Sequence, residues 1–390
     1  MYLSLAYMLL IGLFAGWLCK KCHLPALMGM LITGIVIGPY VLNLIDGSIL
    51  NISTELRKIA LIIILTRAGL TLNVEDLKKV GRPAILMCFV PACLEILGMT
   101  LIVPRVLGVS YIDSFVMGTV VAAVSPAVIV PTMIRIIEEG YGTKQSIPQM
   151  VLAGASVDDV FVIVFFSVAT SLAKGGSVDA MRFVGIPVSI LLGIIVGVVL
   201  GIGLGMYFKK FQMRDTVKVI IIMSISLILV TLEDASPIPF SGLIAIMCMG
   251  IGLQKNRKEV SVRLSKKFNA MWVLAEIMLF ILVGATVNIS YALSAGLGAI
   301  VCIFGALLFR VVGVYICMLN TKLNIKERAF CMIAYMPKAT VQAAIGGVPL
   351  SMGLACGNIV LTVAVLAILI TAPLGAFLIE SMYKKLLVKA

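Results

Sequence analysis

Histidine and charge are scarce in this chain. Only one of its 390 residues is histidine, His23, and 13% are charged, whereas 61% are hydrophobic. A serine-type membrane protease would need His23 as its base, and His23 lies in a connection between apolar runs, so this class is disfavoured. The nine cysteines lie mostly within apolar runs, so with one histidine they suggest neither a disulfide framework nor a Cys/His metal site.

Long apolar runs dominate the chain instead. Its mean hydropathy is +1.16, far outside the range of soluble globular domains. A membrane-spanning helix needs about 20 apolar residues, and runs of this length recur with short polar interruptions. The predicted spans lie near residues 2–19, 24–42, 56–72, 83–103, 111–134, 148–173, 183–208, 216–232, 239–253, 270–289, 293–319, 328–349 and 357–379. The sequence therefore predicts an all-α integral membrane protein with about 13 transmembrane helices.

Positive charge is concentrated on alternate connections. The net charge of +13 invites a nucleic-acid partner, but with thirteen spans 23 of the 31 basic residues fall on one side of the membrane and 5 on the other. This is the positive-inside pattern, so we expect no nucleic-acid partner, an N-terminus outside and a cytoplasmic C-terminus. Lys20 and Lys21 follow the first apolar run, which argues against a cleaved signal peptide. With no targeting tail in the sequence, we expect the plasma (cell) membrane.

Thirteen spans divide into six, one and six. A first unit over 1–173, a linker helix over 183–208 and a second unit over 216–390 would give two inverted six-helix repeats within one membrane domain, 1–390. Many secondary transporters have this architecture, with the substrate site near the middle of the membrane where the repeats meet.

The fifth span of each unit contains proline near its centre. Pro126 follows Ser125 in the first unit, and Pro337 precedes Lys338 in the second. Proline in a helix interior removes a backbone hydrogen bond and clashes with the preceding turn. Broken helices are tolerated in hydrocarbon only where they line a cavity or are buried in protein. Either span alone could be an ordinary kinked helix, but matching positions in both units favour two broken helices.

Two adjacent aspartates, Asp158 and Asp159, interrupt an otherwise uncharged run over 148–173. Each ionised carboxylate costs roughly 2.5 to 3.5 kcal/mol at the centre of a membrane helix, and adjacent like charges also repel. Neighbouring helix positions differ by about 100°, so one aspartate can hold a basic partner while the other faces a cavity. A bound cation would relieve the repulsion.

Other charged residues also lie inside predicted spans. The acids number four and the bases three, so they sum to −1 when ionised: Glu95, Asp158, Asp159 and Glu276 against Arg67, Arg310 and Lys338. One Na⁺ or one proton would neutralise this set, as a one-for-one exchanger requires. Arg310 is effectively always protonated, so the aspartates or Lys338 must titrate. Buried charges of this kind usually pair with an opposite charge or a carbonyl for structural reasons, and this is the favoured interpretation for Arg67 and Glu276.

Several motifs together resemble the NHA branch of the sodium/proton antiporters, in the cation/proton antiporter superfamily. They are Gly154-Ala-Ser-Val-Asp158-Asp159-Val, Val124-Ser125-Pro126-Ala-Val-Ile-Val-Pro131, and Lys326-Glu327-Arg328 followed by Met336-Pro337-Lys338-Ala339-Thr340-Val341-Gln342. Their order and spacing match, so the resemblance covers essentially the whole chain. It implies a homodimer in which a core bundle, with two broken helices crossing at the ion site, moves against a dimerisation bundle in an elevator-like cycle.

The resemblance also implies residue roles. Asp158 and Asp159 become the pair that binds ions and protons. Arg310 matches a position where several electrogenic relatives keep a lysine that pairs with the first aspartate, and Glu95 resembles a partner of the arginine. Whether Arg310 pairs with Glu95 or Asp158 stays open. Lys338 would balance the dipole of the second broken helix.

Ser125 and Pro126 stand where the best-known bacterial antiporter has a carboxylate, which changes the expected ion coordination. We expect Na⁺ or Li⁺ to be bound by the two aspartates with help from Ser125, Thr132 or backbone carbonyls, because hard cations prefer oxygen ligands.

The expected function is therefore exchange of Na⁺ or Li⁺ for H⁺ by alternating access, without enzymatic activity and without a cofactor beyond the transported ions. A K⁺/H⁺ exchanger and a sodium-coupled solute symporter on a similar scaffold remain alternatives. A structural or ion-gated regulatory membrane protein would show no turnover. An intramembrane aspartyl protease needs its two aspartates on different helices, whereas here they are adjacent on one.

Overall fold

A computed structural model describes residues 1–22, 24–71, 81–174, 180–235 and 240–389. His23 and two basic residues that enter the predicted charge asymmetry, Lys78 and Lys79, lie outside these ranges. The regular structure of the described residues is helical, apart from one isolated β-bridge between Tyr141 and Lys389.

Eight helices in the described part of the chain are long and apolar enough to cross a membrane. They are Tyr2–Lys21, Arg82–Leu107, Ile147–Ala173, Leu191–Lys210, Asp215–Glu233, Lys258–Ala285, Gly296–Cys317 and Gly357–Leu386. Shorter apolar helices cover Ala26–Ile37 and Tyr111–Val121. The predicted all-helical membrane class is confirmed, and the count of about thirteen spans is consistent with these helices.

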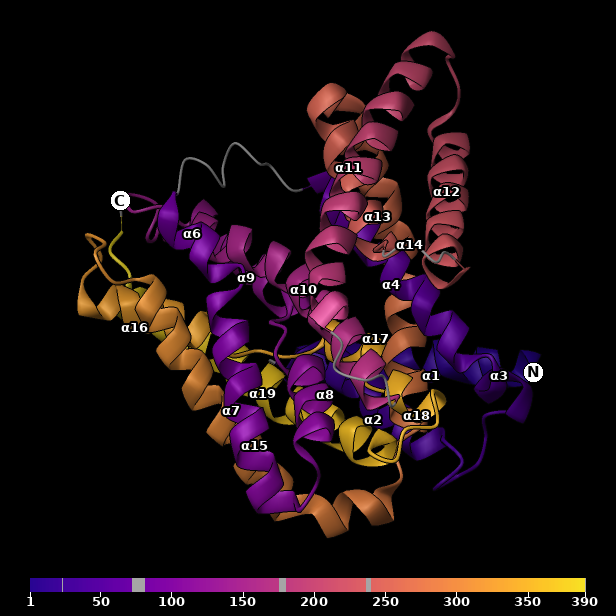
Figure 1. The fold of residues 1–390 in the computed structure, drawn as a ribbon, viewed down its shortest axis with the longest axis vertical. Helices are drawn as coiled ribbons and strands as arrows, with labels where there is room; N and C mark the ends of the chain where they lie inside the picture. The colour runs from indigo at the N-terminus through magenta and orange to yellow at the C-terminus, as the bar shows by residue number, and fades with distance from the viewer. Residues whose placement is uncertain (23, 72–80, 175–179, 236–239, 390) are drawn as a thin grey trace. The chain divides into compact units, whose positions relative to one another are not determined.

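The chain forms two compact units. The first comprises Met1–Thr54, Asp76–Gly175 and Ile277–Ala390, and the second comprises Glu55–Glu75 and Gly176–Glu276. This division does not follow the predicted boundaries of the repeats, which stay a prediction. The helices of the first unit are α1 (Tyr2–Lys21), α2 (Ala26–Ile37), α3 (Gly47–Asn51), α6 (Arg82–Met87), α7 (Val90–Leu107), α8 (Tyr111–Val121), α9 (Pro126–Glu138), α10 (Ile147–Ala173), α15 (Ile289–Cys317), α16 (Ile325–Ala334), α17 (Thr340–Ile345), α18 (Val348–Ser351) and α19 (Gly357–Leu386) (Figure 1).

The second unit is built mainly from four helices and part of a fifth. They are α4 (Ser53–Thr71), α11 (Ala180–Lys210), α12 (Asp215–Ala235), α13 (Gly242–Asn256) and the first part of α14 (Lys258–Ala285), which continues into the first unit. Helix α11 carries glycine at every fourth position from Gly193 to Gly205. A Cβ atom at Gly197 would lie 2.4 Å from the Ala245 carbonyl oxygen, and one at Gly201 would lie 2.2 Å from the Met249 carbonyl oxygen. The glycines therefore let α11 and α13 pack backbone against backbone, as small residues do between membrane helices.

Both predicted helix breaks are present in the first unit. Helix α8 ends at Val121 and α9 begins at Pro126, while α16 ends at Ala334 and α17 begins at Thr340. Ser125, which precedes a proline, is extended (φ −92°, ψ 108°), because the proline ring disfavours helical backbone there. The two unwound segments contact each other, since the Ser125 amide donates to the Pro337 carbonyl oxygen at 2.8 Å.

One predicted span contains a helix interruption, and one predicted boundary is wrong. The span predicted over 83–103 is present as Arg82–Leu107, but its regular helix is interrupted at Cys88 and Phe89, between α6 and α7. Pro91, near the start of α7, has no amide hydrogen and its ring excludes a regular helix through the preceding turn. The connection predicted between 253 and 270 is largely helical, because α14 already begins at Lys258. A search for apolar runs misses this basic helical extension.

A buried apolar cluster packs α6, α10 and α16 together. Its members include Met87 on α6, Val151 on α10 and Tyr335, which directly follows α16. Gly154 makes this contact close, because a Cβ atom there would lie 2.0 Å from the Tyr335 hydroxyl oxygen and 2.9 Å from Met87 Cβ. The Tyr335 hydroxyl in turn donates to the Met87 carbonyl oxygen at 3.3 Å. The aromatic ring therefore lies directly against the backbone of α10, one helical turn before Asp158.

Candidate ion-binding site

Asp158 and Asp159 lie near the middle of α10, and both are buried, with 0% and 7% of their surface exposed. One carboxylate oxygen of Asp158 has two hydrogen-bond partners. Its Oδ2 atom accepts hydrogen bonds from Arg310 Nη2 at 3.0 Å and from the Val124 amide of the first unwound segment at 2.8 Å. No ion pair joins Asp159 to any residue that the structure describes. The two aspartates thus have the different environments expected from their 100° separation.

Arg310, on α15, connects four parts of the first unit. Besides Asp158 it donates from Nη1 to Glu95 Oε2 at 2.7 Å and to the Ala122 carbonyl oxygen, and from Nε to the Tyr335 carbonyl oxygen at 2.7 Å. Its planar fork suits several acceptors in fixed directions. Arg310 therefore pairs with both Glu95 and Asp158, which answers the question that the sequence left open.

Lys338, in the second unwound segment, shares an acceptor with Arg310. Its Nζ atom lies 2.5 Å from Glu95 Oε2 and 3.5 Å from the Ala122 carbonyl oxygen, and the side chains of Lys338 and Glu95 are fully buried. The Lys338 amide donates to Thr371 Oγ1 at 2.9 Å, which anchors this segment to α19. Glu95 therefore neutralises charge from α15 and from the second break, and the predicted dipole-balancing role of Lys338 stays a prediction.

Five of the seven intramembrane charges gather in this cluster: Glu95, Asp158 and Asp159 against Arg310 and Lys338. Arg67 and Glu276 belong to the second unit and interact electrostatically with each other. Since this pair is neutral, its removal leaves the cluster at −1 when all five groups are ionised. The excess negative charge is the quantity that one alkali cation or one proton would cancel.

Several buried oxygen atoms without a partner lie in the first unwound segment, on α10 and on α17. They are Ser125 Oγ, Asp158 Oδ1, Asp159 Oδ1, Thr340 Oγ1 and Gln342 Oε1, none of which has a hydrogen-bond partner among the described residues. The Ser125 hydroxyl is thus buried without a partner among the described residues, and its role as an ion ligand stays a prediction. Thr132 differs, because its half-buried hydroxyl donates to the Val128 carbonyl oxygen at 3.2 Å within α9. Pro126 and Pro337 flank the unwound segments as predicted.

Thr340 and Gln342 lie in a motif of the sequence, but their chemistry alone did not mark them as site residues. Both are buried, at 2% and 0% exposed, on the short helix α17 that follows the second break. Their polarity within an apolar run was the available signal, and only the fold places Gln342 against the backbone at the end of α8 and in the unwound segment.

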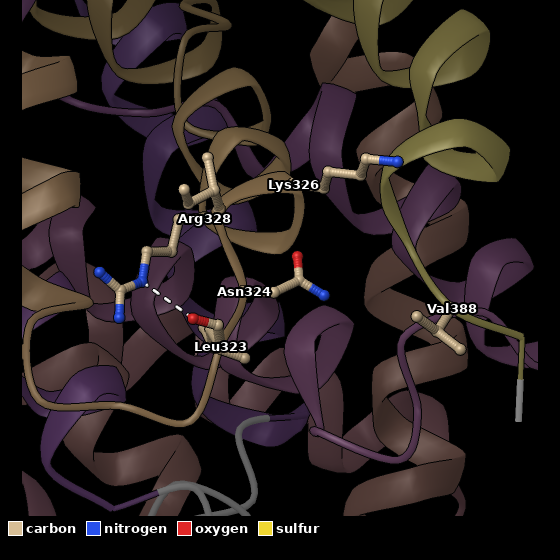
Figure 2. Close-up of a pocket in the computed structure, with 6 residues that line it drawn as sticks. Leu323, Asn324, Lys326, Arg328 and Val388 are labelled. Carbon is tan, nitrogen blue, oxygen red and sulfur yellow. Dashed lines mark hydrogen bonds between the residues drawn. The ribbon is translucent and has the colours of Figure 1, made fainter.

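An open hollow of about 670 Å³ lies at the start of α16 (Figure 2). It is lined by Leu323, Asn324, Ile325, Lys326, Arg328 and Val388. Arg328 Nε donates to the Leu323 carbonyl oxygen at 3.0 Å, the bond drawn in Figure 2. The charged residues of this lining are basic and would repel an alkali cation, so the buried cluster is the candidate ion site.

Comparisons with known proteins identify the family of the chain. Residues 9–385 match the family model described as "Sodium/hydrogen exchanger, transmembrane". The chain is 33% identical over 387 residues to human sodium/hydrogen exchanger 9B2, covering 94% of this chain and 70% of that protein. It is 30% identical over 385 residues to human sodium/hydrogen exchanger 9B1, covering 94% and 73%.

A solved structure confirms the fold. The sodium proton antiporter MjNhaP1 from Methanocaldococcus jannaschii, determined at pH 8, superposes with a TM-score of 0.87 at 20% identity, covering 98% of this chain and 97% of that chain. The predicted resemblance is confirmed, and the protein is a multi-pass membrane transporter and not an enzyme. The chain belongs to the sodium/hydrogen exchanger family.

Proposed function

We propose that this chain is a secondary-active antiporter that exchanges Na⁺ or Li⁺ for H⁺ by alternating access, with cation and proton competing for Asp158 and Asp159. Membership of the sodium/hydrogen exchanger family supports cation/proton antiport. One observation carries the finer proposal: Asp159 is buried beside Asp158, yet no ion pair joins it to the described residues. A buried carboxylate without a basic partner is costly when ionised, so an exchangeable proton or cation must neutralise it.

Competition follows from the charge of the cluster. With Glu95 and Asp158 compensated by Arg310 and Lys338, Asp159 carries the excess charge of −1. A proton on Asp159 cancels this charge, and so does a cation bound to its oxygens. A site that is neutral in both loaded states can cross hydrocarbon, whereas the unloaded site carries a charge whose burial is costly.

The stoichiometry is proposed from Arg310. A guanidinium keeps its proton at physiological pH, so Arg310 does not release one when the cation binds, and exchange is one proton for one cation. Membrane voltage then leaves the equilibrium unchanged. Movement of one net charge per cycle would instead shift it by about 2.3 kcal/mol per 100 mV. A reversal-potential measurement at fixed pH and sodium gradients distinguishes the two.

The remaining elements of the proposal rest on family resemblance and on the distribution of basic residues. The chain forms a homodimer in the plasma membrane, with its N-terminus outside, and a core bundle that contains both broken helices moves in an elevator-like cycle. The basic residues favour this orientation because they concentrate on one side of the predicted spans.

The central test is sodium-dependent dequenching of a pH dye in proteoliposomes loaded with acid. We expect Asp159→Asn to abolish dequenching, because the amide neither binds a proton nor supplies the negative charge. Asp113→Asn is the matched control, since Asp113 lies at the start of α8 and bonds Ser110. Sodium-driven exchange that survives in Asp159→Asn refutes the assignment. Dequenching by K⁺ alone would favour a K⁺/H⁺ exchanger.

A further inference from the structure

Gln342 ties the two broken helices together through their backbone. Its side chain is fully buried on α17, and its Nε2 atom donates to the Val121 carbonyl oxygen at 3.0 Å and to the Ala123 carbonyl oxygen at 2.6 Å. These carbonyls lie at the end of α8 and in the unwound segment, where a regular helix cannot satisfy them. The amide group therefore substitutes for helical hydrogen bonds at the first break.

The orientation of this amide is fixed by chemistry. An amide can be turned by 180° without changing its shape, but Val121 and Ala123 offer only acceptors, so the NH₂ group must face them. The Oε1 atom consequently points away from the two carbonyls. It is buried and has no hydrogen-bond partner among the described residues. Burial of an unpartnered amide oxygen is unfavourable unless something binds it.

Thr340 presents a second atom of this kind. Its hydroxyl oxygen is buried and unpartnered within the described part of the chain, and it lies two residues before Gln342 at the start of α17. The Ser125 hydroxyl and one oxygen of Asp159 are in the same state. The Ser125 amide bonds the Pro337 carbonyl oxygen, so the two unwound segments are in contact, and the Val124 amide of the first segment bonds Asp158. Neutral and anionic oxygens together form the ligand set that a hard cation prefers.

We propose that Thr340 and Gln342 are specificity-determining residues, whose Oγ1 and Oε1 atoms bind the transported alkali cation beside Asp159. The inference rests on the proposed function and adds a role for α17. Neutral ligands add coordination for a partly dehydrated cation without changing the net charge of the cluster. A proton needs only one carboxylate oxygen. Loss of a neutral ligand therefore weakens cation binding and leaves proton binding unchanged.

Thr340→Val is the cleanest variant, because valine has the same shape and the lost hydroxyl bonds no described residue. A purely structural role predicts an equal or higher melting temperature and an unchanged KM. The ligand role predicts that the sodium concentration for half-maximal dequenching rises on the order of tenfold, the value of one neutral polar contact. Thr362→Val is the matched control, since its buried hydroxyl bonds Asn358 within α19.

Gln342→Met removes both polar ends of the side chain at similar volume, and Gln342→Glu keeps an oxygen while removing the NH₂ group. If Oε1 is a ligand, Gln342→Met raises the KM for Na⁺ and changes the ratio of the Li⁺ and Na⁺ constants. The activity profile at fixed sodium also moves to higher pH, by about one unit per tenfold loss of cation affinity, because protons then compete more successfully. If Gln342→Met does not fold, the sodium concentration for half-maximal dequenching in Thr340→Val tests the inference by itself.

A binding measurement without transport separates this inference from the proposed function. Sodium should raise the melting temperature of the wild-type protein, and less sodium-dependent stabilisation is expected in Thr340→Val, since stabilisation follows ligand affinity. The role of α17 is overturned if Thr340→Val and Gln342→Met keep the wild-type KM for Na⁺ and the wild-type sodium-dependent rise in melting temperature. If Asp159→Asn is inactive in the same experiments, the antiport proposal still stands. Activity in Asp159→Asn would instead refute the proposed function.

Discussion

Glu95 is the acceptor that Arg310 and Lys338 share, so Glu95→Gln perturbs both bases at once. Its Oε2 atom lies 2.7 Å from Arg310 Nη1 and 2.5 Å from Lys338 Nζ, and all three side chains are at most 1% exposed. Removal of one partner from a buried ion pair costs about 3–5 kcal/mol, because an uncompensated charge remains in the interior. Arg310 keeps Asp158, whereas the remaining contact of Lys338 is the Ala122 carbonyl oxygen at 3.5 Å. We therefore expect the loss to come mainly from Lys338.

A double-mutant cycle tests this reasoning. Lys338→Met removes the ammonium that Glu95→Gln would leave unpaired, so the double variant should lose less stability than the two single variants together. Contacting charges in one network typically couple by about 0.5–3 kcal/mol. The assay is the free energy of unfolding in mixed detergent micelles at neutral pH without sodium. Additive losses, or a cost below about 1 kcal/mol for Glu95→Gln, would refute a buried shared acceptor.

Glu380→Gln supplies the matched control. Glu380 forms an ion pair with Arg135, but the two side chains are 50% and 46% exposed. Exposed pairs contribute about 0–1 kcal/mol, since water already solvates both charges. The same chemical change should therefore have a small effect at position 380 and a large one at position 95.

Two further predictions concern close backbone packing. Gly201→Ala should cost about 1–3 kcal/mol of stability by overpacking, because its Cβ would lie 2.2 Å from the Met249 carbonyl oxygen. Gly203→Ala is the control and should not destabilise the protein, because a Cβ there would meet open space. Equal melting temperatures for these two variants would contradict the packing of α11 on α13. Gly375→Ala places a Cβ 2.4 Å from Pro337 Cγ and should displace the second unwound segment, so we expect slower sodium-dependent dequenching at normal protein yield. Wild-type rates would mean that this segment tolerates displacement.

The helix breaks and the buried charges could be predicted from sequence because their causes are local. Pro126 and Pro337 exclude regular helix wherever they stand inside a span, and Asp158 and Asp159 are costly in any apolar run. The interruption before α7 has the same local cause, Pro91, but the span prediction over 83–103 did not use it.

The partners of the charges could not be predicted in this way. Arg310 and Glu95 are 215 residues apart in sequence, and their contact depends on the packing of α15 beside α7 (Figure 1). Charge counting gave a net value of −1 but did not separate the neutral pair of Arg67 and Glu276 from the cluster. The orientation of Gln342 depends on two carbonyls of another broken helix, which no pattern within α17 encodes.

The contact between Gly154 and Tyr335 restricts how α10 can move relative to the second unwound segment. A ring in direct contact with a helix backbone leaves no room for sliding, and Tyr335 also accepts from Arg310 through its carbonyl oxygen. Helix α10, which carries both aspartates, and the second unwound segment are therefore held together as one rigid element. In the alternating-access cycle proposed above, a hinge would then lie outside this contact, and substitutions there would alter turnover and leave cation affinity intact.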